Sequence, residues 1–238
     1  MIGVTNLHFS HGKIAVLNGI TLHAGAYEFI ALTGPNGAGK TTCLQALAGI
    51  LPGGRPDARR VAYVEQGAGV SWGRMRVRDV VQLGRLPHGD DAPASVTRAM
   101  RLCGVAGWEN RPIAQLSGGE ARRVMLARAF AGDPAVLLLD EPVADLDPAA
   151  AHDIMQVLTG FAASGGTVVA VLHALDLACT YANRLVVMQA GRIVADGLPA
   201  QKLPMVASVF NMRLAIDSTQ RLLPIATTPN PKDGLHGY

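Results

Sequence analysis

The residues from Gly34 to Thr41 have the types and the order needed to hold phosphate. The run Gly-Pro-Asn-Gly-Ala-Gly-Lys-Thr follows an apolar stretch and opens a segment with helical character. Glycines let backbone N–H groups converge on phosphate oxygens, and the positive end of the following helix adds to their effect. Lys40 is expected to reach the β- and γ-phosphates and Thr41 to ligate Mg²⁺. The predicted nucleotide-binding residues are Gly34, Pro35, Asn36, Gly37, Ala38, Gly39, Lys40, Thr41 and Thr42.

Two adjacent acids, Asp140 and Glu141, follow the apolar run Leu137 to Leu139. Ligands of open α/β sheets bind at the carboxyl ends of the strands, so we expect both acids to lie near the phosphate loop. Asp140 would hold Mg²⁺, directly or through water. Glu141 would orient and polarise the water that attacks the γ-phosphate. The alternative is a solvated acidic strand end.

The elements that must position these residues follow from the hydrophobic pattern. The first 33 residues read as strands separated by short turns at Gly12, Gly19 and Gly25, and strands then alternate with helices. This alternation predicts a parallel sheet wrapped by helices. Strands are expected at 2–9, 15–22, 27–33, 60–64, 135–139, 167–172 and 184–188, and helices at 40–50, 119–131, 148–163 and 175–182. The runs 135–139 and 167–172 are apolar throughout, as in central strands covered on both faces.

An arginine-rich segment interrupts this alternation. Residues 55–111 hold ten arginines against six acids, a net charge of +4, while the whole chain carries +3. Helices are expected at Val77 to Arg85 and Ala94 to Leu102, with no strand between them, so the segment reads as a helical insertion. A net charge of +3 is too small to indicate bulk nucleic-acid binding. The alternative for the arginines is a solvated face.

The length of 238 residues predicts one compact unit. No run approaches the roughly 18 to 20 apolar residues that a membrane-spanning helix needs. Met1 to Lys13 does not resemble a secretory leader, so we expect a cytoplasmic protein. A terminal hairpin is expected from Arg213–Ile216 and Arg221–Ile225. The following residues 227–238, rich in proline and polar residues, are expected to fray.

The run Leu116-Ser117-Gly118-Gly119-Glu120 narrows the class of ATPase. With it, the sequence resembles the ATP-binding subunit of ABC transporters, and the resemblance covers nearly the whole chain. The family's other motifs appear in their usual order: Gln66 in the Q-loop, Asp145-Leu146-Asp147 in the D-loop and His173 as the switch histidine. A lone Ser-Gly-Gly is an ordinary helix cap, and a lone histidine an ordinary core residue, but the ordered set of motifs is specific.

The resemblance implies an α/β fold with a P-loop (RecA-like) core formed by 1–66 and 117–226. An N-terminal antiparallel β subdomain and a helical subdomain at 67–116 would complete it. The family's solution to ATP binding is a head-to-tail homodimer, with each ATP between the phosphate loop of one chain and the signature of the other. The resemblance therefore adds further nucleotide-binding residues: Ser117, Gly118, Gly119, Glu120 and Asp147. It assigns catalytic roles to Glu141, His173, Gln66 and Lys40, and Mg²⁺ to Thr41, Gln66 and Asp140.

The sequence departs from the family pattern at two site positions. Family members usually place an aromatic residue where this chain has His11, whose imidazole offers less area for stacking on adenine. Val16 would pack beside the ribose or is simply a strand residue. Ala174 replaces the acid that usually follows the switch histidine.

Two segments resemble one branch of the family, the importers of iron siderophores, haem and cobalamin. They are Asp79 to His88, which contains Gly84-Arg85-Leu86-Pro87-His88, and Val209 to Arg213. A helix end followed by a proline explains Gly84 to His88 equally well. The resemblance implies transmembrane permease partners, an extracytoplasmic substrate-binding protein, no nucleic acid, and a peripheral position on the cytoplasmic face of the membrane. An ATPase of an exporter or lipid extractor, and a soluble non-transport ABC ATPase, remain as alternatives.

Overall fold

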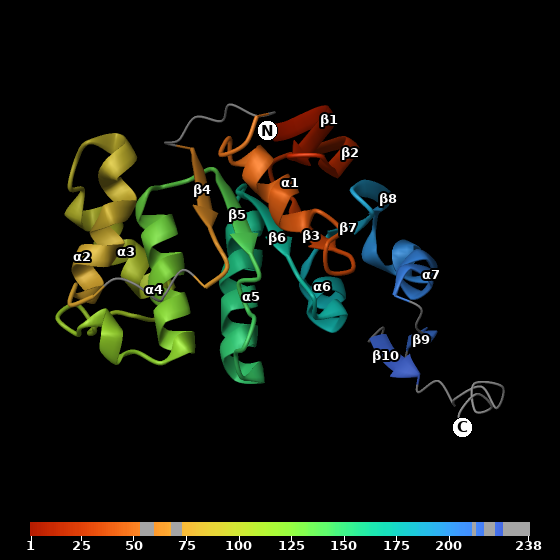
Figure 1. Cartoon of the computed structure of the whole chain (residues 1–238). Coiled ribbons are helices and arrows are strands. Elements are labelled where there is room, and N and C mark those ends of the chain that lie inside the picture. Colours follow the sequence, from red (N-terminus) through yellow and green to blue (C-terminus); the bar gives the residue numbers. More distant parts are fainter. Residues whose placement is uncertain (53–59, 68–72, 211–212, 217–221, 226–238) are drawn as a thin grey trace, which may run out of the picture.

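A computed structural model describes residues 1–52, 60–67, 73–210, 213–216 and 222–225. Helices pack on a central sheet, and the β-hairpin formed by the first two strands lies beside the first helix (Figure 1). The strands are β1 (Ile2–His11), β2 (Ile14–Ala24), β3 (Phe29–Thr33), β4 (Val61–Val64), β5 (Val136–Asp140), β6 (Thr167–Val171), β7 (Arg184–Gln189), β8 (Arg192–Gly197), β9 (Arg213–Ile216) and β10 (Leu222–Ile225). The helices are α1 (Lys40–Leu47), α2 (Val77–Gln82), α3 (Pro93–Leu102), α4 (Gly118–Ala131), α5 (Pro148–Ala163), α6 (Leu175–Tyr181) and α7 (Pro199–Val209), with 3₁₀ turns η1 (Leu83–His88) and η2 (Ile113–Gln115).

The central sheet has six strands in the order β4-β5-β6-β3-β7-β8. Neighbours from β4 to β7 are parallel, which confirms the expected sheet, whereas β8 pairs antiparallel with β7 at the edge. Every residue of β3, β5 and β6 is buried, as expected of strands covered on both faces. Since β3 and β5 are parallel, the phosphate loop and the two acids emerge at the same edge of this sheet.

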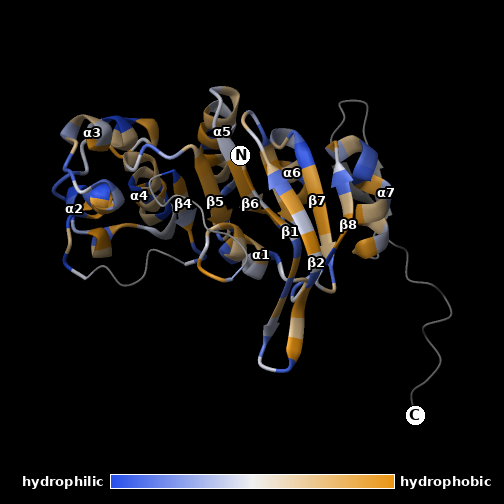
Figure 2. Cartoon of the chain, turned by 90° about the horizontal axis from the view of Figure 1, so that it is seen from above, coloured by the Kyte–Doolittle hydropathy of each residue, from blue (hydrophilic) through white to orange (hydrophobic). Residues whose placement is uncertain are grey.

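The two faces of the sheet pack against different layers. Phe29 and Ala31 of β3 face the cluster formed with α4 to α7, while Ile30 and Leu32 face α1 and the β1–β2 hairpin. Successive strand residues point to opposite faces, so an all-apolar strand supplies both cores. Figure 2 shows the apolar strands between these layers.

A helical lobe of α2, η1 and α3 packs beside α4 at one end of the molecule (Figure 1). The helix expected at 77–85 is shorter: α2 ends at Gln82 and the chain continues as the 3₁₀ turn η1. Pro87 lies inside η1, and a proline lacks the N–H that an α-helix would need there.

Three further details differ from the sequence-based expectations. Gly19 lies within β2 and does not form a turn; Leu7 pairs with Ile20 and His8 with Asn18, so Gly19 is an extra residue in the ladder. The strand β8 and helix α7 were not anticipated.

Among the described ranges, no helix has the length and apolar character to cross a membrane. The hairpin strands β9 and β10 form as expected, while 218–220 and 227–238 lie outside the described residues.

Candidate active site

The phosphate loop leaves β3 at Thr33 and enters α1 at Lys40. It begins against strand β7, where a Cβ on Gly34 would collide with the carbonyl oxygen of Met188. Gly34 also has a φ of 147°, which side-chain-bearing residues rarely adopt. The glycine at this position is therefore required both by its backbone conformation and by the close approach of β7.

A cavity of about 510 Å³ opens over this loop. It gathers most of the nucleotide and catalytic residues that the sequence predicts: Val16, Asn36, Gly37, Ala38, Gly39, Lys40, Thr41, Thr42, Gln66, Glu141 and His173. Segments far apart in the sequence thus meet at one edge of the sheet, in agreement with the expected position of ligands in such folds.

Lys40 is the buried cation of the cavity. Its Nζ donates hydrogen bonds to the carbonyl oxygens of Gly34, at 2.8 Å, and Pro35, at 2.9 Å. Burial lowers the pKa of Lys40, while the carboxylates of Glu141 and Asp140 act in the opposite direction. The loop backbone thus fixes the ammonium group within the loop that would hold the phosphates.

Asp140 lies beneath the cavity at the end of β5. It is 2% exposed, and its Oδ1 has no hydrogen-bond partner. Burial raises the pKa of Asp140, and a hydrogen bond with the Thr41 side chain acts in the opposite direction. A buried carboxylate oxygen without a partner is costly, so this group suits a cation or a water bound to one.

Glu141 is held between two predicted catalytic residues. Gln66 Nε2 donates to its Oε2 at 2.8 Å, and His173 Nε2 lies 2.8 Å from its Oε1. Because a carboxylate only accepts, the histidine nitrogen is the donor. Glu141 also has a φ of 51°, in the left-handed region that non-glycine residues seldom occupy. The Q-loop, the strand end and the switch position therefore converge on one carboxylate.

The signature residues lie at a different cavity, of about 420 Å³. Ser117 and Gly118 line it together with Gly67 and the D-loop residues Asp145 and Leu146. Ser117 also caps α4, because its Oγ accepts from Glu120 N at 3.3 Å while Glu120 Oε2 accepts from Ser117 N at 2.8 Å. A single chain thus carries two separate places at which a helix begins beside a cavity, α1 and α4.

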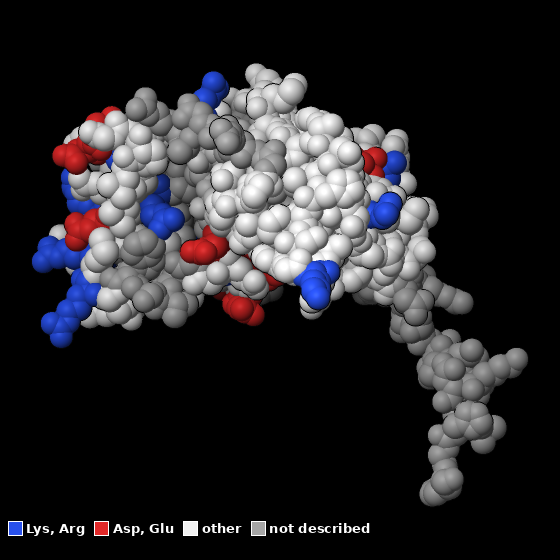
Figure 3. All heavy atoms as spheres, turned by 45° about the horizontal axis from the view of Figure 1, so that its top comes forward, with Lys and Arg blue, Asp and Glu red and all other residues white. Residues whose placement is uncertain are grey.

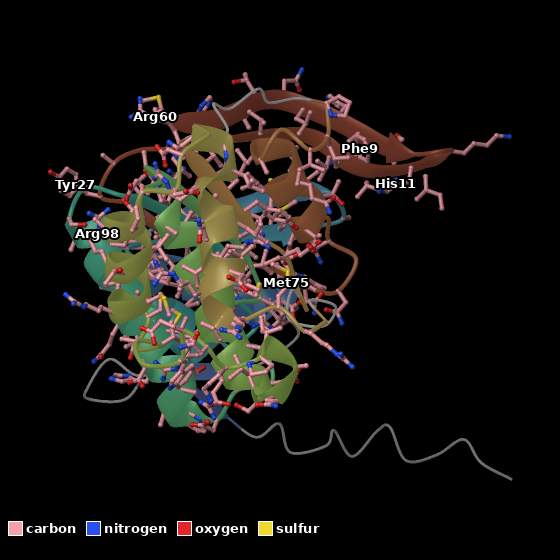
Figure 4. All side chains as sticks on the ribbon, turned by 90° about the vertical axis from the view of Figure 1, so that its left-hand side faces the viewer. Phe9, His11, Tyr27, Arg60, Met75 and Arg98 are labelled. Atoms are coloured by element: carbon pink, nitrogen blue, oxygen red, sulfur yellow. The ribbon has the colours of Figure 1, made fainter. Side chains whose placement is uncertain are left out.

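Seven predicted residues line neither cavity: Gly34, Pro35, Gly119, Glu120, Asp140, Asp147 and His11. Glu120 serves the capping box of α4, and Asp147 caps α5 by accepting from Ala149 N and Ala150 N. His11 packs edge-on against Phe9, with ring centroids 4.9 Å apart. Figure 4 shows these two rings side by side near the end of the hairpin.

Arg122 lines the signature cavity and was not predicted. Its Nη1 is buried without a hydrogen-bond partner. Burial lowers the pKa of Arg122, while the carboxylates of Asp145, Glu141 and Asp140 act in the opposite direction. The signal in the sequence was its spacing: Arg122 follows Gly118 by four residues, so both lie on one face of α4.

The chain is similar in sequence to known proteins. Residues 17–144 match the ABC transporter family. A hemin import ATP-binding protein, HmuV, of Streptomyces coelicolor is 38% identical over 94% of this chain and 84% of its own length. A cobalamin import ATP-binding protein, BtuD, of Halobacterium salinarum is 35% identical over 97% of this chain and 64% of its own length.

The fold agrees as well. A solved structure of a metal-chelate type ABC transporter in an inward-facing conformation is similar, with a TM-score of 0.83 over 95% of this chain and 98% of that chain. Its sequence identity of 23% supports the fold alone. The family match and the relatives above 30% identity carry the assignment further, so the chain belongs to the ABC transporter family, as one of its ATP-binding subunits.

Proposed function

We propose that this chain hydrolyses MgATP as a head-to-tail homodimer and thereby drives the import of a metal chelate through separate permease subunits. The observation that carries the proposal is the placement of Glu141. It stands at the cavity of the phosphate loop, bridged by Gln66 and His173 through bonds of 2.8 Å on both carboxylate oxygens. A carboxylate fixed in this way would orient the attacking water and accept its proton, and this supports the proposal.

The residues present fit a magnesium ion. Asp140 offers a buried oxygen without a partner, and the Thr41 side chain lies within hydrogen-bond reach of Asp140. Mg²⁺ keeps several waters and takes only one or two protein carboxylates in addition to phosphates. Thr41, Asp140 and Gln66 would hold the Mg²⁺. When bound, the ion would neutralise charge on the β- and γ-phosphates.

The two separate cavities support a dimeric site. Lys40 lines one and Ser117 the other, so one ATP held by the phosphate loop does not also meet the signature of the same chain. In a head-to-tail dimer the signature of each chain would face the γ-phosphate of the other, and the backbone N–H groups of Gly118 and Gly119 at the α4 N-terminus would donate hydrogen bonds to it. Glu120 would stabilise the first turn of α4, and Asp147 would stabilise the first turn of α5.

The adenosine would lie along the β1–β2 hairpin. Val16 of β2 lines the cavity and is proposed to pack against the ribose. His11 pairs with Ile14 at the end of the same hairpin and is proposed to stack on the adenine. Its ring would keep its edge contact with Phe9 while offering a face to the base.

The cargo follows from the relatives. The proteins of similar sequence import hemin or cobalamin, as their names state. Both are metal chelates, and we propose one of these or an iron siderophore as the cargo. The chain would work at the cytoplasmic face of the membrane, below permease subunits that receive the chelate from an extracytoplasmic binding protein.

Transport by the assembled complex tests the proposal. The chain would be co-expressed with candidate permease and binding-protein subunits and reconstituted in proteoliposomes. ATP supplied on the side of this chain should drive uptake of radiolabelled haem, cobalamin or ferric siderophore from the other side. Movement in the opposite direction would show an exporter. ATP hydrolysis without association with any permease would show a non-transport ATPase.

A further inference from the structure

The segment Gly84–His88 caps the C-terminal end of α4. Arg85 is 6% exposed, and its Nη1 donates to the Ala131 carbonyl oxygen at 3.1 Å. His88 Nε2 lies 2.8 Å from the carbonyl oxygen of Gly132. The last carbonyls of a helix have no partners inside the helix, and cations are favoured there. The segment therefore supplies the missing donors. The sequence suggested either a resemblance to the importer branch or a helix end followed by a proline.

Arg85 also joins two acids at this point. Its Nε and Nη2 donate to the two carboxylate oxygens of Asp90, at 2.8 and 2.9 Å, and its Nη1 donates to Asp133 Oδ2 at 3.0 Å. Asp133 further accepts from Ser95 Oγ at 2.8 Å and from Arg98. A two-pronged guanidinium–carboxylate pair fixes orientation as well as distance. Arg98 is labelled in Figure 4, on the lobe side of the molecule.

Asp133 lies in the link between α4, which ends at Ala131, and β5, which begins at Val136. Its φ of 48° is in the left-handed region, and such a backbone persists where the surroundings determine it. Here the surroundings are donors from η1 and from α3. The cluster therefore fixes the joint between the helix that begins at the signature and the strand that ends at Asp140.

Close packing adds to this constraint. A Cβ on Gly84 would collide with the carbonyl oxygen of Arg128, and a Cβ on Gly132 would approach the carbonyl oxygen of Gly84 to 2.9 Å. The two glycines let η1 approach the backbone of α4 directly. The joint is thus held by backbone contact as well as by charge.

We propose that Arg85 is a positioning residue for ATP hydrolysis, holding the signature helix α4 and the strand β5 as one rigid unit. The proposal rests on the proposed function. In the dimer, Ser117 would act on the ATP of the partner while Glu141 acts on the ATP of its own chain. The angle between α4 and β5 then decides whether both residues reach their nucleotides together. Arg85 lies at the opposite end of α4 from the signature, about 20 Å away, and lines neither cavity, so it would touch neither ATP.

Steady-state hydrolysis and nucleotide binding test the proposal on the purified full chain with MgATP. Arg85→Ala should lower kcat by at least about tenfold, since a misplacement of about 1 Å from a remote change can cost more than that. ATP affinity should stay within about twofold, because no partner of Arg85 lines the cavity over the phosphate loop. Arg85→Lys should recover little, since an ammonium cannot form the two-pronged pair. The control Arg101→Ala removes an exposed arginine of the same lobe and should behave as wild type.

A second variant covers the case in which Arg85→Ala does not fold. Asp90→Asn changes a half-exposed partner and should lower kcat in the same direction with unchanged ATP affinity. Wild-type kcat in folded Arg85→Ala or in Asp90→Asn would overturn the proposal, as would equal losses of kcat and affinity. If the wild-type chain itself does not hydrolyse ATP, the proposed function fails. If the wild type is active and the variants match it, only the role of Arg85 fails.

Discussion

At the residue scale, the proposed hydrolysis depends on the carboxylate of Glu141, which Gln66 and His173 hold in place. Glu141→Gln keeps the shape of the side chain but removes the acceptor of the proton from water. We expect kcat to fall by about 10²- to 10⁴-fold, the usual contribution of a general base. ATP should still bind and should now drive stable dimers, because the phosphate contacts remain. Size-exclusion chromatography with MgATP and a hydrolysis assay measure both effects.

The matched control for this prediction is Lys40→Ala. It removes the buried cation that lies within the phosphate loop, so ATP binding and ATP-driven dimerisation should both be lost. Normal turnover in the Glu141→Gln variant would remove Glu141 from the mechanism.

Asp140 lends itself to a prediction about pH and stability. Burial raises the pKa of Asp140 in the folded state above the ordinary value of 3.8, which the unfolded state retains. Between the unfolded-state pKa and the folded-state pKa, the folded state therefore binds more protons than the unfolded state. The free energy of unfolding of the metal-free chain must therefore fall as the pH rises through this window. The destabilisation is complete above the raised pKa.

Asp140→Asn removes this buried charge. In EDTA at neutral pH it should raise the free energy of unfolding by about 1 kcal/mol, the lower end of the cost of an unsatisfied buried group. For a chain of this length that corresponds to about 2–4 °C in Tm. Mg²⁺ should stabilise the wild type but not the variant, and hydrolysis should be lost. Differential scanning fluorimetry at pH 4 and pH 7 checks the sign: a variant less stable than wild type at pH 7 would contradict it.

At the element scale, α4 begins with a residue that has two roles. Ser117 closes the capping box with Glu120, and hydrogen bonding from the Ser117 backbone lowers the pKa of Glu120. Ser117 would also face the γ-phosphate of the partner's ATP. A substitution that keeps the cap but repels phosphate separates these roles.

Ser117→Asp is such a substitution, because aspartate caps helices as well as serine does. We expect the free energy of unfolding to stay within about 0.5 kcal/mol of wild type, whereas Ser117→Ala should cost about 1 kcal/mol. Hydrolysis and ATP-driven dimerisation should be lost in Ser117→Asp, since its carboxylate would meet the γ-phosphate. Urea unfolding and chromatography measure the two properties. Retained dimerisation in Ser117→Asp would place the signature away from the nucleotide.

The elements also show how far the sequence could predict the structure. The strands β5 and β6 were predictable because both faces are covered and every residue is apolar. The edge strand β8 has one exposed and five half-buried residues and an apolar run of only three residues, 193–195, so its pattern was not distinctive. Helix α7 contains Pro199 at its start and Pro204 inside, and prolines normally indicate a break. These two elements depend on tertiary packing against β7, which a local pattern does not report.

The candidate site was predictable to the extent that its residues are adjacent in the sequence. The phosphate loop and the two acids carry their chemistry in short runs, and the structure brings these together with Gln66 and His173. The burial of Arg85 was not predictable, because its partners Asp133 and Ala131 lie more than forty residues away. An arginine in an arginine-rich segment reads as solvated unless its distant acceptors are known.

At the scale of the whole molecule, the lobe separates two kinds of arginine. Figure 3 shows Lys and Arg side chains gathered at the end formed by the lobe, with acids among them. Arg74 and Arg78 are exposed there, whereas Arg85 is buried and committed to α4. A permease segment docking on the lobe would therefore contact Arg74 and Arg78. Arg85 would affect docking only by determining the shape of the lobe.

Reversal of the two exposed charges tests docking without disturbing hydrolysis. Arg74→Glu combined with Arg78→Glu should weaken binding to the cognate permease by about tenfold or more, a change of about 1.4 kcal/mol, because an acidic docking segment that pairs with the two arginines would be repelled by the glutamates. The isolated chain should keep its ATPase kcat, since neither residue lines the cavity of the phosphate loop. Arg192→Glu, an exposed arginine of β8 at the other end of the molecule, provides the matched control (Figure 1). Co-purification from co-expressing cells measures the binding. If the double variant assembles as well as the Arg192→Glu control, these arginines are a solvated face and the permease docks elsewhere.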